Sequence, residues 1–131
     1  MIVVATMQNL SSIVKLVKPL YVNGLNNYWC DKNWLVKQIK AQKTYISISK
    51  GKTQGVLIYE SNYITVLSVF KKYQRQGIAS KLIQNIKGLS CVDTLKIYGV
   101  VPFYERLGFK QKYSYTVGKY SCIHLSRGKG E

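Results

Sequence analysis

Apolar and polar positions change their period along this chain, and the changes predict its elements. The start, "MIVVAT", is typical of a short β-branched strand. Apolar positions then recur at helical spacing in two segments. The first covers about residues 10–20 and should end at Pro19, and the second runs from an N-cap at Asp31 to about Ala41.

From residue 44 onward the pattern becomes that of strands. "TYISIS" alternates, "VLIY" and "YITVLSVF" are apolar, and the turn-forming stretches "GKTQG" and "ESN" separate them, which predicts an antiparallel meander. A helix follows over residues 77–87, with Gly88 just past its end. "TLKIYGV" predicts another strand, "PFYERLG" a short helix that ends at Gly108, and "FKQKYSYTV" with "YSCIHLSR" a closing hairpin.

The element order is therefore β-α-α-β-β-β-α-β-α-β-β. It predicts an α/β (α+β) fold with a single mixed, mostly antiparallel sheet of about six or seven strands and about four helices on both faces. The 131 residues suit a single domain over residues 1–131. We expect no membrane span and no signal peptide. The three cysteines lack metal-binding spacing, so we expect buried thiols, no metal site and a cytoplasmic location.

The charge is strongly positive, with 20 Lys and Arg against 5 Asp and Glu, a net charge of +15. The lysines are spread along the chain, so the pattern predicts a basic surface that attracts nucleic acid, a phosphate-rich cofactor, an acidic protein or a membrane surface. A merely solubilising Lys-rich surface is the other interpretation. Few arginines and no RNA-binding aromatic motif weigh against nucleic acid.

One loop combines several features that favour an anion. The strand that ends at Phe70 and the helix that begins near Gly77 are joined by residues 71–76, which include Lys71, Lys72 and Arg75. The first amides of a helix lack intrahelical partners, and the helix dipole adds positive potential there. Gly77 lets the backbone approach a ligand, so the stretch predicts a phosphate or pyrophosphate site that is neither a Walker loop nor GxGxxG.

Two motifs in this region resemble those of the GNAT superfamily of N-acetyltransferases. "LSVFKKYQRQGIASKLI" is similar to its acyl-CoA-binding motif, a strand followed by Gln/Arg-x-x-Gly-x-Gly/Ala at a helix start. "VPFYERLGF", at residues 101–109, resembles its second signature. Specific residues match only over about residues 65–110, and the layout of elements matches over essentially the whole chain.

The resemblance implies an acetyl-CoA-dependent enzyme that moves an acetyl group to a primary amine by direct attack in a ternary complex. It implies that Tyr104 protonates the leaving thiolate, and that a backbone amide near Val69 polarises the carbonyl. The residues that it assigns to acetyl-CoA, through the pantetheine arm, the pyrophosphate and the groove, are Leu67, Ser68, Val69, Gln74, Arg75, Gln76, Gly77, Ile78, Ala79, Ser80, Phe103 and Arg106.

The general base is where the sequence departs from the family. The Glu that many members carry in the strand before the loop falls at or near Tyr63, and the next carboxylate along the chain is Asp93. Glu60, in the expected turn, is a candidate catalytic residue if that turn folds inward. We expect Asp93 at a turn or strand start, and His124 on the last strand, away from the acyl group. Deprotonation by solvent is the other possibility.

The acceptor is not specified by any motif. In the family it is shaped by the first two helices and the last hairpin, which here carry the aromatic residues Tyr21, Tyr28, Trp29, Trp34, Tyr113, Tyr115 and Tyr120. The positive charge argues against polyamines and favours a protein amine in acidic surroundings. Two other functions stay open: a basic nucleic-acid-binding protein, and an acyl-CoA-sensing module with little turnover. The oligomeric state is open, a homodimer included.

Overall fold

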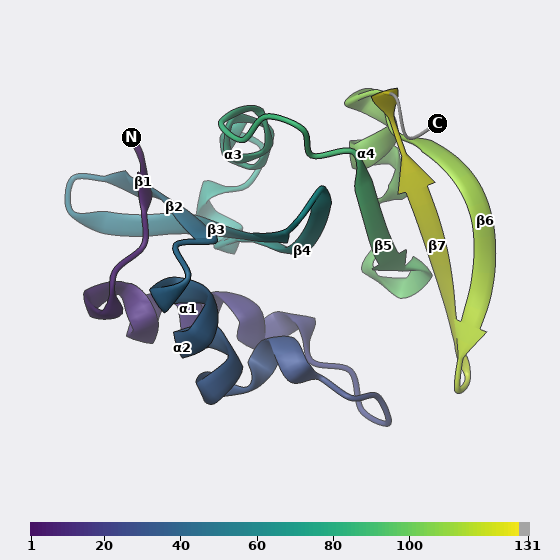
Figure 1. The fold of residues 1–131 in the computed structure, drawn as a ribbon, viewed down its shortest axis with the longest axis horizontal. Helices are drawn as coiled ribbons and strands as arrows, with labels where there is room; N and C mark the ends of the chain where they lie inside the picture. Colours follow the sequence, from purple (N-terminus) through teal and green to yellow (C-terminus); the bar gives the residue numbers. More distant parts are fainter. Residues whose placement is uncertain (129–131) are drawn as a thin grey trace.

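Seven strands form one twisted sheet, in the order β1-β2-β3-β4-β5-β7-β6, and helices cover both of its faces (Figure 1). The structure, a computed structural model, describes residues 1–128. Every neighbouring pair of these strands is antiparallel except β4 and β5, which are parallel. The predicted mixed, mostly antiparallel sheet is confirmed.

The elements follow the predicted order. The strands are β1 (Ile2–Val4), β2 (Thr44–Ser49), β3 (Lys52–Glu60), β4 (Tyr63–Val69), β5 (Cys91–Leu95), β6 (Lys110–Val117) and β7 (Tyr120–Ser126). The α-helices are α1 (Leu10–Val17), α2 (Lys32–Lys40), α3 (Ile78–Gln84) and α4 (Val101–Arg106). Short 3-10 turns lie at Met7–Asn9, Lys18–Leu20, Tyr28–Cys30, Lys71–Tyr73 and Lys96–Tyr98. Within residues 1–128, no helix is both long and apolar enough to cross a membrane.

Two apolar cores lie on opposite faces of the sheet. The helices α1 and α2 cover one face, and α3 and α4 cover the other (Figure 1). Strand β3 shows how the chain supplies both, because neighbouring residues of a strand point to opposite faces. Leu57 packs in the core under α3 and α4, whereas Val56 and Ile58 pack in the core under α1 and α2.

A β-bulge at Thr65 divides β4 into two parts. The register pairs Ile64 with Tyr59 and Val66 with Ile58, which leaves Thr65 as an extra residue opposite β3. As a result Ile64 packs in the α3–α4 core, while Val66, two residues later, packs in the α1–α2 core. The bulge reverses which face each side chain of β4 points to.

Strands β4 and β5 separate at this bulge. They pair only at Tyr63 with Cys91 and at Ile64 with Val92. Beyond the bulge, residues 66–69 keep their partners on β3 but have none on β5. A bulge bends its strand and increases the local twist, which accounts for the separation. The sheet therefore opens a wedge between β4 and β5, with β5, β7 and β6 on its far side (Figure 1).

The predicted strand "TLKIYGV" is wrong beyond its first residues. Strand β5 ends at Leu95, a 3-10 turn occupies Lys96–Tyr98, and Gly99 follows with a φ of 68°. Tertiary contacts override the β propensity of this stretch. Leu95 packs in a small cluster with Val22 and Cys122, and the Tyr98 hydroxyl donates a hydrogen bond to the Leu20 carbonyl.

Strand β3 is longer at both ends than predicted. Residues 52–55 of the expected break belong to it, and so does Glu60, which was expected in a turn. A glycine inside a strand often marks a close approach. A Cβ built on Gly55 would lie 3.0 Å from Val69 Cγ2 and 3.4 Å from Ile78 Cγ2. Gly55 is therefore a packing position, where the start of α3 comes close to the sheet.

Candidate active site

A single cavity of about 1450 Å³ follows the wedge between β4 and β5. It extends to the start of α3 on one side and to the segment between α1 and α2 on the other. The sequence-predicted site residues that line it are Glu60, Leu67, Ser68, Val69, Gln74, Arg75, Gly77, Ile78, Ala79, Ser80, Phe103, Tyr104 and Arg106. Gln76 is not part of the lining, and its side-chain amide donates to the Lys72 carbonyl at 3.5 Å.

The backbone of β4 presents an open edge to the wedge. The Phe70 amide donates to the Gln54 carbonyl of β3 at 3.0 Å, so by alternation Leu67 and Val69 direct their backbone groups to the other side. The Val69 carbonyl accepts a hydrogen bond of 3.0 Å from the Gln74 side chain. Ser68 points its hydroxyl away, to the Leu16 carbonyl of α1 at 2.6 Å.

The loop before α3 contains two left-handed residues. Arg75 has a φ of 65° and Gly77 a φ of 80°. A Cβ on Gly77 would meet nothing within 4 Å, so the backbone conformation, and not a lack of space, is what favours glycine. The positively charged side chains of Lys71 and Arg75 line the cavity beside this turn. Backbone amides and cations thus share one end of the cavity, which favours an anion there.

Tyr104 lies where α4 meets the cavity. Its side chain is held edge-on between Phe103 and Phe109, at ring centroid distances of 5.1 and 5.5 Å, and the residue is only 5% exposed. Burial raises the pKa of the Tyr104 phenol well above its ordinary value. The phenol therefore keeps its proton at neutral pH and has the protonation state of a general acid.

Glu60 lies at the end of β3 and faces the same cavity. Its carboxylate accepts a hydrogen bond of 3.1 Å from the Thr65 hydroxyl, the residue that forms the bulge. This side chain therefore reaches the wedge from a strand, without the inward-folded turn that the sequence had required.

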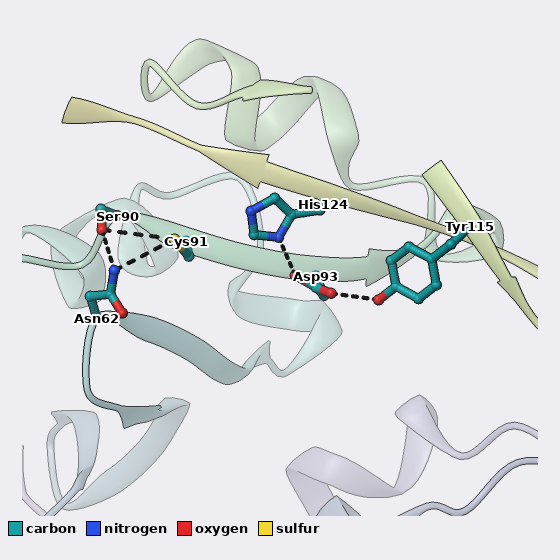
Figure 2. A network of polar contacts seen from close by, with 6 residues as sticks. All are labelled: Asn62, Ser90, Cys91, Asp93, Tyr115 and His124. Atoms are coloured by element: carbon teal, nitrogen blue, oxygen red, sulfur yellow. Dashed lines mark hydrogen bonds and ion pairs between the residues drawn. The ribbon is translucent and has the colours of Figure 1, made fainter. Parts of the chain in front are cut away.

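A polar network that the sequence did not predict lies on the far side of the wedge (Figure 2). Asp93 was expected at a turn or strand start, but it is the central residue of β5. Its carboxylate accepts a hydrogen bond of 2.5 Å from the Tyr115 hydroxyl, and its other oxygen lies 2.6 Å from His124 Nδ1. Asp93 and Tyr115 line the cavity. His124 lies on β7, as expected, but is joined to the cavity through Asp93.

Only some of the aromatic residues expected at the acceptor region line the cavity. Of the seven aromatics named as candidates for the acceptor region, Tyr28, Trp29 and Tyr115 line the cavity. Tyr28 lines this cavity together with Glu60 and Asp93, and burial, followed by the charges of these two carboxylates, raises the pKa of the Tyr28 phenol. The two acidic side chains and the tyrosines thus share the part of the cavity next to the α1–α2 segment.

Asn62 holds the closed end of the wedge together (Figure 2). Its side-chain amide donates to Ser90 Oγ at 2.8 Å and to Cys91 Sγ at 3.5 Å. The main-chain carbonyl of Asn62 accepts from the main-chain amides of Ser90 and Cys91 at 2.9 and 3.1 Å. These bonds fix the turn before β4 to the start of β5, so the two strands separate from a fixed point.

Comparison with known proteins assigns the family. The family model described as the acetyltransferase (GNAT) domain matches residues 25–124. The chain belongs to the GNAT acetyltransferase family. Solved structures share the fold of this GNAT protein at low identity, and no curated protein matches its sequence.

Three of these structures show the extent of the likeness. A GNAT-family acetyltransferase from Bacillus cereus ATCC 10987 is 17% identical, with a TM-score of 0.75 and 98% of each chain covered. An N-acetyltransferase from Staphylococcus aureus Mu50 is 17% identical, with a TM-score of 0.74 and 95% of this chain and 98% of that chain covered. YncA from Salmonella typhimurium, solved with its cofactor acetyl-CoA, is 13% identical, with a TM-score of 0.71 and 95% and 91% covered.

Proposed function

We propose that this chain is an N-acetyltransferase that moves the acetyl group of acetyl-CoA to a primary amine by direct attack in a ternary complex. The observation that carries the proposal is the continuity of one cavity, from the left-handed turn at Gly77, along the open edge of β4, to the carboxylates on the acceptor side. Membership of an acetyltransferase family supports acetyl transfer as the reaction. A structural neighbour that was solved with acetyl-CoA supports the same cofactor.

The residues present fit acetyl-CoA. The backbone groups of Leu67 and Val69 on the open edge of β4 suit an amide-bearing pantetheine arm, which they would bind as an added strand. The amides of residues 74–80, with Lys71 and Arg75, suit the phosphates. Phe103 and Arg106 of α4 would flank the groove.

Acyl transfer to an amine makes three demands on the protein. The carbonyl oxygen gains negative charge, and a backbone N–H of β4 near Val69 would stabilise it. The departing sulfur needs a proton, which the buried Tyr104 phenol would donate. The amine must be neutral when it attacks, and its proton would pass to a carboxylate on the acceptor side of the cavity, where Glu60 and Asp93 lie. Acetyl-CoA itself supplies the activated acetyl group.

A protein amine suits this site better than a small polyamine. The net charge of +15 repels free polycations over the whole surface. The chain carries only 5 Asp and Glu, and Glu60 and Asp93 both face the acceptor part of the cavity. A single amine on a neutral or acidic chain would meet these carboxylates without that repulsion.

Calorimetric titration with acetyl-CoA and with CoA tests the cofactor. We expect binding at sub-millimolar concentration, and its loss in Gly77→Glu, which adds a carboxylate to the proposed phosphate site. Gly118→Glu is the matched control, because Gly118 also has a positive φ, 58°, and open space around it, but lies in the β6–β7 turn. If the wild type binds neither ligand, the proposal fails.

Thiol release then separates an enzyme from a sensor. A panel of primary amines, with the free N-termini and lysines of peptides included, should release CoA thiol with the wild type. Tyr104→Phe should bind acetyl-CoA as well as the wild type does but release thiol more slowly. Binding of acetyl-CoA without thiol release for any amine would instead favour the acyl-CoA-sensing function.

A further inference from the structure

Asp93 occupies a special place at the wedge. It directly follows Val92, the last residue of β5 that pairs with β4. Val92 packs in the α3–α4 core, so the alternation of side chains points Asp93 to the opposite face, towards the α1–α2 segment. The cofactor proposed above would lie along β4 in the wedge, and Asp93 would face it from the side on which an acceptor would enter.

Two hydrogen bonds fix the orientation of the Asp93 carboxylate (Figure 2). Tyr115 donates to one oxygen at 2.5 Å and His124 Nδ1 lies 2.6 Å from the other. The His124 side chain is 10% exposed and stacks on Tyr113 at a ring centroid distance of 4.7 Å, whereas the Asp93 side chain is 36% exposed. The carboxylate is thus the accessible member of a network whose other members are held by packing.

We propose that Asp93 binds the ammonium group of the acceptor and takes its proton, while His124 and Tyr115 act as positioning residues. The inference rests on the proposed function and names the proton acceptor that the sequence left open. Glu60 has a weaker claim to this role, because it is exposed at the end of a strand and its carboxylate is held by the Thr65 hydroxyl alone within residues 1–128. The position at which the resemblance to the family places a carboxylate falls at or near Tyr63 in this chain.

The proton balance of the reaction is simple. The acceptor enters as R–NH₃⁺ and gives one proton to the Asp93 carboxylate. The neutral nitrogen then forms the bond to the acetyl carbon as the carbon–sulfur bond breaks. The nitrogen loses its second surplus proton and the sulfur leaves as a thiol, protonated through Tyr104. Asp93 finally releases its proton to solvent, so the products are the amide, CoA and one proton.

The groups around Asp93 define its environment. Tyr115 and His124 contact Asp93 from β6 and β7. The charge of Asp93 also contributes to raising the pKa values of three neighbouring groups, those of Tyr28, Tyr63 and Cys122. Glu60 is the other carboxylate of this cavity. An ammonium group would therefore find negative charge and hydroxyl groups around it, in a protein whose overall charge is positive.

The single histidine allows a test without turnover, since His124 alone gives imidazole signals in a ¹H–¹⁵N NMR spectrum. In the wild type loaded with CoA, we expect n-butylammonium to shift the His124 signals and n-butanol, its uncharged counterpart, to leave them unchanged. In Asp93→Asn neither compound should shift them. A response to n-butylammonium that survives in Asp93→Asn overturns the proposal.

Kinetics provide the second test. Asp93→Asn should lower kcat/KM for the best amine of the panel on the order of 100-fold, because that is the usual contribution of general base catalysis. Acetyl-CoA affinity should stay at the wild-type value. Glu105→Gln is the matched control, since it removes the same charge from a helix residue outside the cavity lining. Tyr115→Phe and His124→Gln should lower kcat and change its pH profile, with a smaller effect on KM.

The outcomes separate this inference from the proposed function. Failure of the wild type to bind acetyl-CoA, or to release thiol with any amine, counts against N-acetyl transfer itself. Wild-type turnover in Asp93→Asn, or a larger loss in Glu60→Gln than in Asp93→Asn, overturns the role of Asp93 while N-acetyl transfer stands. A folded Asp93→Asn protein that keeps acetyl-CoA affinity and loses both turnover and the amine response supports it.

Discussion

The side-chain amide of Gln74 donates a hydrogen bond of 3.0 Å to the main-chain carbonyl of Val69. This bond occupies one of the backbone hydrogen-bond acceptors on the open edge of β4, at the point where a bound pantetheine arm would pair. Gln74 is exposed, so its side chain can move away at little cost. The residue therefore competes with the proposed cofactor for the same acceptor.

Gln74→Ala should tighten acetyl-CoA binding. The substitution frees the Val69 carbonyl, and a net hydrogen bond contributes about 0.5–1.5 kcal/mol, which corresponds to a Kd about 2- to 10-fold lower. Calorimetry measures this change directly. Gln76→Ala is the control, because Gln76 lies outside the cavity lining. A higher Kd in Gln74→Ala would show that the Gln74 side chain itself contacts the cofactor.

Tyr104→Phe should reduce the rate of acetyl transfer and leave the cofactor affinity unchanged. Loss of a general acid typically costs on the order of 100-fold in kcat. The ring stays in place between Phe103 and Phe109, so we expect the variant to remain folded. Steady-state thiol release, with calorimetry for the affinity, measures both. An unchanged kcat would remove Tyr104 from the chemistry.

The pH profile provides an independent check on the same residue. Burial raises the pKa of Tyr104, so its neutral, proton-donating form persists above pH 10, the value at which a free tyrosine is half ionised. In the wild type, kcat should therefore not fall between pH 8 and 10 through loss of this proton. A decrease over that range that disappears in Tyr104→Phe would contradict a buried, protonated phenol.

The loop before α3 and the start of α4 could be predicted because each depends on residues that are close together in the sequence. The loop before α3 could be predicted because Gly77, at a φ of 80°, is required by the local backbone. The start of α4 could be predicted because Pro102 suits the first turn of a helix. These features depend on residues that are close in sequence. They are the same features that carry the resemblance to the GNAT family.

The acceptor side depends on contacts that no local pattern specifies. Asp93 is separated along the sequence by 22 residues from Tyr115 and by 31 residues from His124. The register of β5, β7 and β6 brings the three side chains together. A shift of one residue in either pairing would turn these side chains to opposite faces. The bulge at Thr65 is equally hidden, because one extra residue in an apolar strand leaves its composition unchanged.

Gly55→Ala should lower both stability and cofactor affinity. The new Cβ would lie 3.0 Å from Val69 Cγ2 and 3.1 Å from the Ser68 carbonyl, a backbone atom that cannot move alone. Overpacking of this kind costs about 1–3 kcal/mol of the free energy of unfolding. Because the displaced atoms belong to Ser68 and Val69, the stretch of β4 whose other side is the open edge, acetyl-CoA binding should weaken as well. Urea denaturation and calorimetry measure the two effects.

Gly118→Ala separates the packing effect from the general cost of replacing a glycine. Gly118 has a φ of 58° and nothing within 4 Å of a built Cβ, so only the left-handed backbone opposes alanine there. We expect a loss of about 1 kcal/mol in stability and unchanged acetyl-CoA binding. Gly55→Ala with wild-type affinity would show that the wedge tolerates a displaced Val69.

Tyr98 should make the stability of this protein depend on pH in the alkaline range. Its hydroxyl donates to the Leu20 carbonyl, and burial, with smaller contributions from Cys30 and Cys122, raises its pKa to about 12. In the unfolded chain a tyrosine ionises near pH 10. Since the folded pKa is the higher one, the stabilisation is complete below about pH 10 and is lost as the pH rises from about 10 to about 12.

Tyr98→Phe removes both the hydrogen bond and this titration. At pH 8 the variant should be less stable than the wild type by about 0.5–1.5 kcal/mol, and the difference should shrink as the pH rises above 10. Urea denaturation at pH 8, 10 and 11 measures it, with Tyr21→Phe, a residue that is 58% exposed, as the control. A difference that stays constant between pH 8 and 11 would mean that the Tyr98 proton is not linked to folding, and that its contact with Leu20 contributes through packing alone.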